Sequence, residues 1–167
     1  MNYQTKNKRV LGIDPGIANT GWAVVVKSSR GYRLIGDGLI QTDSKASTGD
    51  RLLAIYKVVS EVVATQMPDR LAIERCFHNK NISSSQSTGA VIGVCQLLSA
   101  QAGIEVIAFT PQQLKSASVF DGGADKKAVQ RMLCKIFQRD RFNAHVTDAV
   151  ACGISGLLTL SWETFKN

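Results

Sequence analysis

The chain has 167 residues, of which 44% are hydrophobic and 20% are charged, and these values are typical of a globular protein with one core. No apolar run approaches the length of a membrane-spanning helix, so we expect no membrane association. The formal net charge of +7 favours a polyanionic partner such as nucleic acid.

The cysteines are far apart and form no C-x-x-C pair, which argues against a zinc site or a disulfide framework. We therefore expect reduced thiols and a cytoplasmic location. Residues 1–8 carry positive charge but no apolar segment follows them, so we expect a frayed tail instead of a secretory signal.

Residues 9–26 contain two apolar runs separated by a short polar turn, a pattern that predicts a β-hairpin. Pro15 biases Asp14 toward an extended conformation, and Gly16 supplies freedom for the turn. The Asp14 carboxylate is then displayed at the end of the first strand. Such a group is costly to bury unless it is paired or binds a metal. A turn-capping aspartate is the ordinary alternative.

The rest of the chain alternates strands with helices. The predicted order is a strand at 32–41, a helix at 52–63 that stops before Pro68, a strand at 70–74, a helix at 85–102, a strand at 104–109, a helix begun by Thr110 and Pro111, a basic helix at 125–138 and a last helix from about 146. Ser47 and Asp50 resemble a capping box, and residues 79–88 form a polar, serine-rich segment. This order predicts a single α/β domain with a five-stranded mixed sheet and helices on both faces.

Three acids occupy special positions in this scheme. Asp14 ends the first strand, Glu74 ends the fourth, and Asp148 lies near the start of the last helix, three residues after His145. If the first and fourth strands are parallel neighbours, Asp14 and Glu74 meet at one sheet edge. Clustered carboxylates repel one another unless divalent cations neutralise them, and two Mg²⁺ ions there could support phosphodiester cleavage. Taken singly, Glu74 could be a surface residue, Asp148 a first-turn acid and His145 a structural side chain.

Five segments occur in the order found in one nuclease family. They are Leu11-Gly-Ile-Asp-Pro-Gly16 with Thr20-Gly-Trp22, Ala72-Ile-Glu-Arg-Cys-Phe77, Thr110-Pro-Gln-Gln-Leu-Lys115, Ala124-Asp-Lys-Lys-Ala-Val-Gln130 and His145-Val-Thr-Asp-Ala-Val-Ala151. From about residue 9 to residue 160 the chain thus resembles the RuvC-type Holliday junction endonucleases, which have a ribonuclease H-like fold. Actin-like ATPases also open with an Asp-x-Gly hairpin, but that class needs two such domains.

The resemblance implies a homodimeric endonuclease that nicks two opposing strands of a four-way junction, leaving 5′-phosphate and 3′-hydroxyl ends, during recombination and repair. It implies that Asp14, Glu74 and Asp148 bind two Mg²⁺ ions, which Mn²⁺ could replace. His145 occupies a position that is Asp in some members and His in others, where a neutral imidazole can bind a metal or position water. A branch-migration motor is a further expected partner.

The same resemblance suggests where DNA is contacted. Phe77 matches an aromatic side chain that stacks on bases at the junction centre, although aromatic residues are more often core residues. Lys115 and Lys126 match basic residues near the scissile phosphates, while Lys126 and Lys127 could instead be a solvated helix face. Arg75 stands where many relatives carry a second acid, and it could add a phosphate contact.

Two rival functions remain at this point. The first is a ribonuclease H-like nuclease that acts on RNA or on other branched DNA. The second is a junction-binding module that lacks catalysis. The sequence indicates neither a dimer interface nor a base preference at the cleavage site.

Overall fold

The computed structural model describes residues 8–29, 31–75, 82–110, 113–114 and 126–164. Its five-stranded sheet has the order β3-β2-β1-β4-β5. Strands β1 (Arg9–Asp14), β2 (Asn19–Ser28) and β3 (Gly31–Gln41) form an antiparallel meander. Strands β4 (Arg70–Glu74) and β5 (Glu105–Phe109) extend the sheet in parallel with β1. The predicted five-stranded mixed sheet is confirmed, and the first and fourth strands are parallel neighbours in it.

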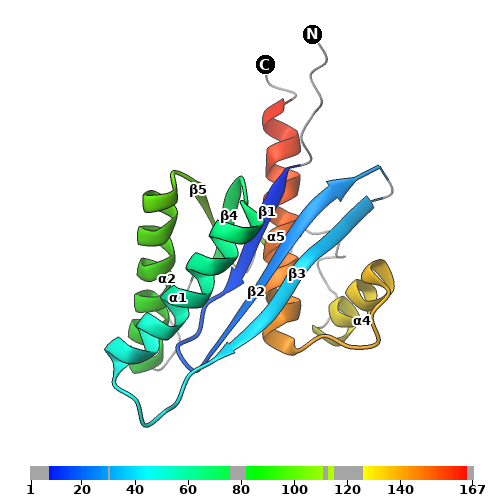
Figure 1. Ribbon diagram of the computed structural model, residues 1–167. Coiled ribbons are helices and arrows are strands. Elements are labelled where there is room, and N and C mark those ends of the chain that lie inside the picture. Colours follow the sequence, from blue (N-terminus) through cyan, green and yellow to red (C-terminus); the bar gives the residue numbers. More distant parts are fainter. Residues whose placement is uncertain (1–7, 30, 76–81, 111–112, 115–125, 165–167) are drawn as a thin grey trace.

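The described helices cover both faces of this sheet (Figure 1). Helices α1 (Thr48–Gln66) and α2 (Ile82–Ala102) pack on one face. Helix α5 (Ala144–Thr164) crosses the other face, and α4 (Lys126–Phe137) packs beside it. No described helix has the length and apolarity needed to cross a membrane.

The helix ends follow from local hydrogen bonds. Ser47 caps α1, because its Oγ accepts from the backbone N–H of Asp50 at 3.2 Å and donates to Asp50 Oδ2 at 2.6 Å. Thr110 Oγ1 accepts from the backbone N–H of Gln113 at 3.0 Å, while Gln113 Oε1 accepts from the Thr110 N–H at 2.8 Å. The predicted helix start at Thr110 is therefore confirmed, whereas most of the helix that would follow lies outside the described residues.

Two predicted helix starts were too late. Helix α2 begins at Ile82 instead of about 85, so part of the serine-rich segment is helical. Serine costs a helix only a few tenths of a kcal/mol, and the buried side chains Val91, Cys95 and Leu98 anchor the helix on the sheet. Helix α5 begins at Ala144 instead of about 146.

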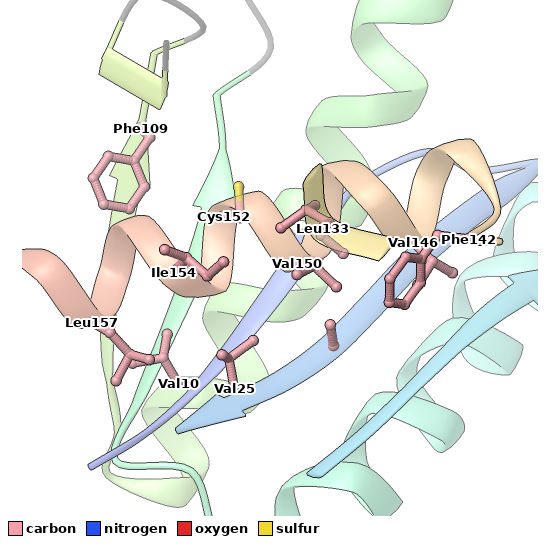
Figure 2. Close-up of a cluster of buried hydrophobic side chains, with 13 residues drawn as sticks. Val10, Val25, Phe109, Leu133, Phe142, Val146, Val150, Cys152, Ile154 and Leu157 are labelled. Atoms are coloured by element: carbon pink, nitrogen blue, oxygen red, sulfur yellow. The ribbon is translucent and has the colours of Figure 1, made fainter. Parts of the chain in front are cut away.

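Alternation along the strands divides the core into two layers. On β1, Leu11 and Ile13 pack against α1 and α2, whereas Val10 packs against α5. On β4, Leu71 and Ile73 face the first layer and Ala72 faces the second. Figure 2 shows the α5 layer, whose labelled side chains are Val10, Val25, Phe109, Leu133, Phe142, Val146, Val150, Cys152, Ile154 and Leu157.

Glycines bring α5 unusually close to the sheet. A Cβ atom at Gly12 of β1 would collide with the backbone of Ala149 and Gly153, and one at Gly21 of β2 would collide with the carbonyl group of His145. Gly153 itself lies against the side chain of Val25. The start of α5 is therefore pressed directly against the ends of β1 and β2.

Candidate functional site

Strand alternation places two acids on the α5 face of the sheet. Asp14 is two residues after Gly12, and Glu74 is two residues after Ala72, so both share the side of the sheet that α5 covers. Ile13 pairs with Ile73 in the parallel register, which makes Asp14 and Glu74 neighbours at the carboxyl ends of their strands. The structure thus brings Asp14 and Glu74 together at one sheet edge, and their role as metal ligands stays a prediction.

The first turns of α5 supply the other two candidate ligands. Asn143 caps the helix: its Oδ1 accepts from the His145 N–H at 2.9 Å, and its carbonyl oxygen accepts from the Thr147 N–H at 2.8 Å. His145 and Asp148 follow within the next turn and a half. Gly21 lies opposite Asp14 in the β1–β2 register, and its missing side chain leaves the space that the His145 backbone fills.

His145 and Asp14 are in direct contact. His145 Nδ1 lies 2.7 Å from Asp14 Oδ2. When Asp14 is ionised, its oxygen can only accept, so Nδ1–H is the donor and Nε2 of the neutral ring retains its lone pair. The side chain of His145 is 43% exposed and that of Asp14 is 17% exposed, so the imidazole stands on the solvent side of the pair.

The carboxyl groups influence one another electrostatically. Burial raises the pKa of Asp14, and the charge of Asp148 raises it further, while the contacts with His145 and the charge of Lys126 oppose the shift. Burial also raises the pKa of the Cys152 thiol well above its usual value, and the charges of Glu74, Asp14 and Asp148 add to this effect. The charges of all three acids therefore reach the Cys152 thiol, and the charge of Asp148 also reaches Asp14.

Lys126 contributes a cation to the same cluster. Its Nζ lies 3.0 Å from Asp148 Oδ2, and this contact raises the pKa of Lys126, with smaller contributions from the charges of Asp14 and Glu74. A hollow beside the ion pair is lined by Lys126, Lys127, Gln130, Ala144, Thr147 and Asp148. Lys126 and Lys127 therefore both lie beside Asp148, and their contact with DNA stays a prediction.

The donor set suits a hard divalent cation. Three carboxylates are oxygen ligands that Mg²⁺ prefers, and the imidazole shifts the preference slightly toward Mn²⁺. The raised pKa of Asp14 indicates a carboxylate that a nearby cation would stabilise. Within the described ranges, no three acidic, histidine or cysteine side chains are grouped to hold an ion in their present positions. The Asp14–His145 and Asp148–Lys126 contacts occupy two of the carboxylates, so ion binding requires these side chains to rearrange.

The remaining DNA-contact predictions differ in outcome. Arg75 is exposed directly after Glu74, and its backbone N–H bonds to the Phe109 carbonyl oxygen at 2.7 Å, which continues the β4–β5 ladder. Its position beside the acids is compatible with a phosphate contact. Phe77 and Lys115 lie outside the described residues, so both assignments stay predictions.

Sequence reasoning missed the residues that position this site. Asn143 carries a recognisable signal, because an asparagine before a helical pattern is a common N-cap. The signal at Gly12, Gly21 and Gly153 is weak, because the atoms that leave no room for a Cβ belong to a distant segment of the chain.

Comparisons with known proteins agree with this geometry. The sequence model of the family described as "Crossover junction endodeoxyribonuclease RuvC" matches residues 10–156. A protein of that name from Halothermothrix orenii is 35% identical over 161 residues, covering 93% of this chain and 98% of the relative. Another from Brevibacillus brevis is 39% identical over 124 residues, covering 74% of this chain and 75% of the relative.

A solved structure shows the same architecture. The structure described as "T. thermophilus RuvC in complex with Holliday junction substrate" superposes with a TM-score of 0.83 at 25% identity, covering 93% of this chain and 97% of the other. RuvC has a ribonuclease H-like fold, and the sheet order and helix placement found here are those of that fold. The chain therefore belongs to the RuvC family of crossover junction endodeoxyribonucleases.

Proposed function

We propose that this protein is a structure-selective DNA endonuclease that resolves four-way junctions by paired, metal-dependent nicks during recombination and repair. The observation that carries the proposal is the convergence of Asp14, Glu74 and Asp148 with His145 on the α5 face of one sheet edge. The names of the relatives and the junction bound by the Thermus protein support the same substrate.

Asp14, Glu74, Asp148 and His145 are the residues that would hold the metal, which we propose to be two Mg²⁺ ions per site, replaceable by Mn²⁺. When bound there, divalent cations would supply activation of the attacking water and stabilisation of the 3′-oxygen that leaves the phosphodiester. The chain's own contribution is to fix Asp14 and Glu74 on rigid strands and His145 and Asp148 on a capped helix.

The basic residues have a separate role in this proposal. Lys126, Lys127 and Arg75 stand next to the acids with exposed side chains, where they can contact phosphate oxygens on either side of the cleaved bond. We propose that Lys115 joins them and that Phe77 stacks on bases at the junction centre. Both roles rest on the family resemblance.

The proposal extends to the assembly and its setting. A four-way junction is two-fold symmetric, so paired nicks require two active sites, and a homodimer supplies them. We propose that residues 1–167 form a single nuclease domain, of which residues 1–8 are a tail, and that the protein acts in the cytoplasm. Cooperation with a branch-migration motor is part of the same proposal.

A cleavage assay on four substrates tests the proposal. The wild-type protein is incubated with Mg²⁺ and a synthetic four-way junction, a fork, a linear duplex or an RNA–DNA hybrid. We expect symmetric nicks in the junction, little cleavage of the others, and no products when the metal is chelated. Preferential cleavage of the hybrid would support a ribonuclease instead. Junction binding without cleavage in any metal would support a binding module.

A further inference from the structure

Basic residues are dense on and just after helix α4. Residues 126–141, which comprise α4 and most of its connection to α5, contain six of the 20 Lys and Arg residues and one of the 13 acids. Helix α2 contains no charged residue at all. Charge needed only for solubility would be spread over the surface, so this concentration indicates a localised anionic partner.

The basic residues of α4 lie on its exposed side in a regular row. Lys127, Arg131 and Lys135 recur every four residues and are exposed. The opposite side of α4 packs on the α5 layer of the core through Val129, Met132, Leu133, Ile136 and Phe137. The row therefore points away from the protein body, and packing fixes its orientation.

The row is also available for an external partner. None of Lys127, Arg131 and Lys135 forms an ion pair with another residue in the described part of the chain. By contrast, the neighbouring Arg139 is bound to Asp37 at 2.9 Å and stacks over Phe142, so it is a structural cation.

The position of the row relates it to the cleavage site. Lys127 lines the hollow beside Asp148, and the row leads from there along α4. Lys127 and Lys135 are eight residues apart, which corresponds to about 12 Å along a helix. On duplex DNA the phosphates of one strand follow each other every ~3.4 Å of axis, so the row spans about three or four base pairs.

We propose that Arg131 and Lys135 of α4 form a phosphate-binding surface. This surface holds the backbone of the duplex arm that extends from the cleavage site along α4. This inference rests on the proposed function and deepens it, because it adds a contact outside the site of chemistry. The surface reads no base sequence, since Arg and Lys contact the phosphates only. Its purpose is to fix the direction in which an arm leaves the site.

The salt dependence of junction binding tests this proposal. The probe is a synthetic four-way junction with arms of about two helical turns, about 20 base pairs each. Binding is measured in the presence of a chelator over a series of salt concentrations. For the double variant Arg131→Gln/Lys135→Gln we expect weaker binding and a log–log salt slope that is smaller by up to about 1.8, because each lost phosphate contact removes about 0.9.

Two control variants make the result specific. The double variant Lys45→Gln/Lys57→Gln removes two exposed charges elsewhere and should leave the slope within error of wild type. The double variant Arg131→Lys/Lys135→Arg keeps both charges and should restore the wild-type slope. Melting temperatures of all variants report whether each has folded.

Several outcomes would overturn the proposal. Lys135 lies in the last turn of α4, where a cation can simply stabilise the helix dipole. A lower melting temperature with an unchanged salt slope would support that role and contradict DNA contact. Equal slope changes in the Lys45/Lys57 control would show a general charge effect. If wild type does not bind the junction at all, the proposed function fails, whereas normal wild-type binding with an unchanged slope refutes only the α4 surface.

Discussion

Asp14 is a proposed metal ligand, and the fold holds its carboxylate at an electrostatic cost. Burial and the Asp148 charge raise the pKa of its carboxyl group above the usual value of 3.8, so the folded chain binds this proton more tightly than the unfolded chain. The destabilisation caused by the ionised carboxylate is fully present at pH values above the pKa in the folded state. It disappears as the pH falls through that pKa to the pKa of the unfolded chain.

We therefore predict that Asp14→Asn stabilises the metal-free protein at neutral pH. An amide removes the charge and can still accept from His145 Nδ1. Removal of the charge should raise the melting temperature, by about 2–4 °C for each kcal/mol gained at this chain length. The difference from wild type should shrink as the pH is lowered toward 4. A variant that melts below wild type at neutral pH, or a difference independent of pH, would contradict this account.

Lys126 neutralises Asp148 in the absence of metal, and it must give up this contact for an ion to bind there. We predict that Lys126→Gln binds Mg²⁺ more tightly than wild type, by up to about fivefold, because an exposed ion pair contributes about 0–1 kcal/mol. Calorimetric titration or the Mg²⁺-induced shift in melting temperature measures the effect. Lys127→Gln is the matched control, since Lys127 is not paired with a carboxylate in the described structure. Equal tightening in both variants would show that net charge alone is responsible.

At the scale of elements, the contact between α5 and the sheet sets the distance between the two pairs of candidate ligands. Asp14 and Glu74 belong to strands, whereas His145 and Asp148 belong to α5. Gly12 allows the α5 backbone to lie directly on β1, because a side chain there would meet the carbonyl oxygen of Ala149. The distance between the two pairs of candidate ligands therefore depends on this contact.

Gly12→Ala should separate the two halves of the site. The added methyl group forces α5 or β1 to move, at a cost of at least about 1–3 kcal/mol, the usual cost of overpacking a core. We predict a lower melting temperature and a loss of junction cleavage larger than the loss of junction binding. Gly93→Ala on α2 has open space around the new Cβ and should keep cleavage and gain up to about 1 kcal/mol. Normal cleavage by Gly12→Ala would show that the close contact is not required.

The elements themselves could largely be predicted from local sequence patterns, and their contacts could not. Apolar alternation and the Asp-Pro-Gly turn located β1 and β2, and the spacing of acids at strand ends located Asp14 and Glu74. The start of α2 was misplaced because serines disfavour helix only weakly and tertiary packing overrides them. The glycine contacts were missed, because they depend on backbone atoms that are more than a hundred residues away.

At the scale of the whole molecule, charge and fold divide the surface into distinct regions. Asp14, Glu74 and Asp148 lie near one sheet edge beside the start of α5, and a row of basic residues follows α4 away from it. Composition predicted a polyanionic partner but not this separation, because the total charge contains no information about position. The pairing of Lys126 with Asp148 was likewise visible only once α4 and α5 were placed side by side.

We propose that Asp14 serves the chemistry and not the recognition of the junction. Binding and Mg²⁺-dependent cleavage of one synthetic four-way junction, each measured for wild type and for Asp14→Asn, distinguish the two roles. We predict that the variant binds with an affinity close to that of wild type and produces no symmetric nicks. Cleavage by the variant at the wild-type rate would contradict the assignment of the site.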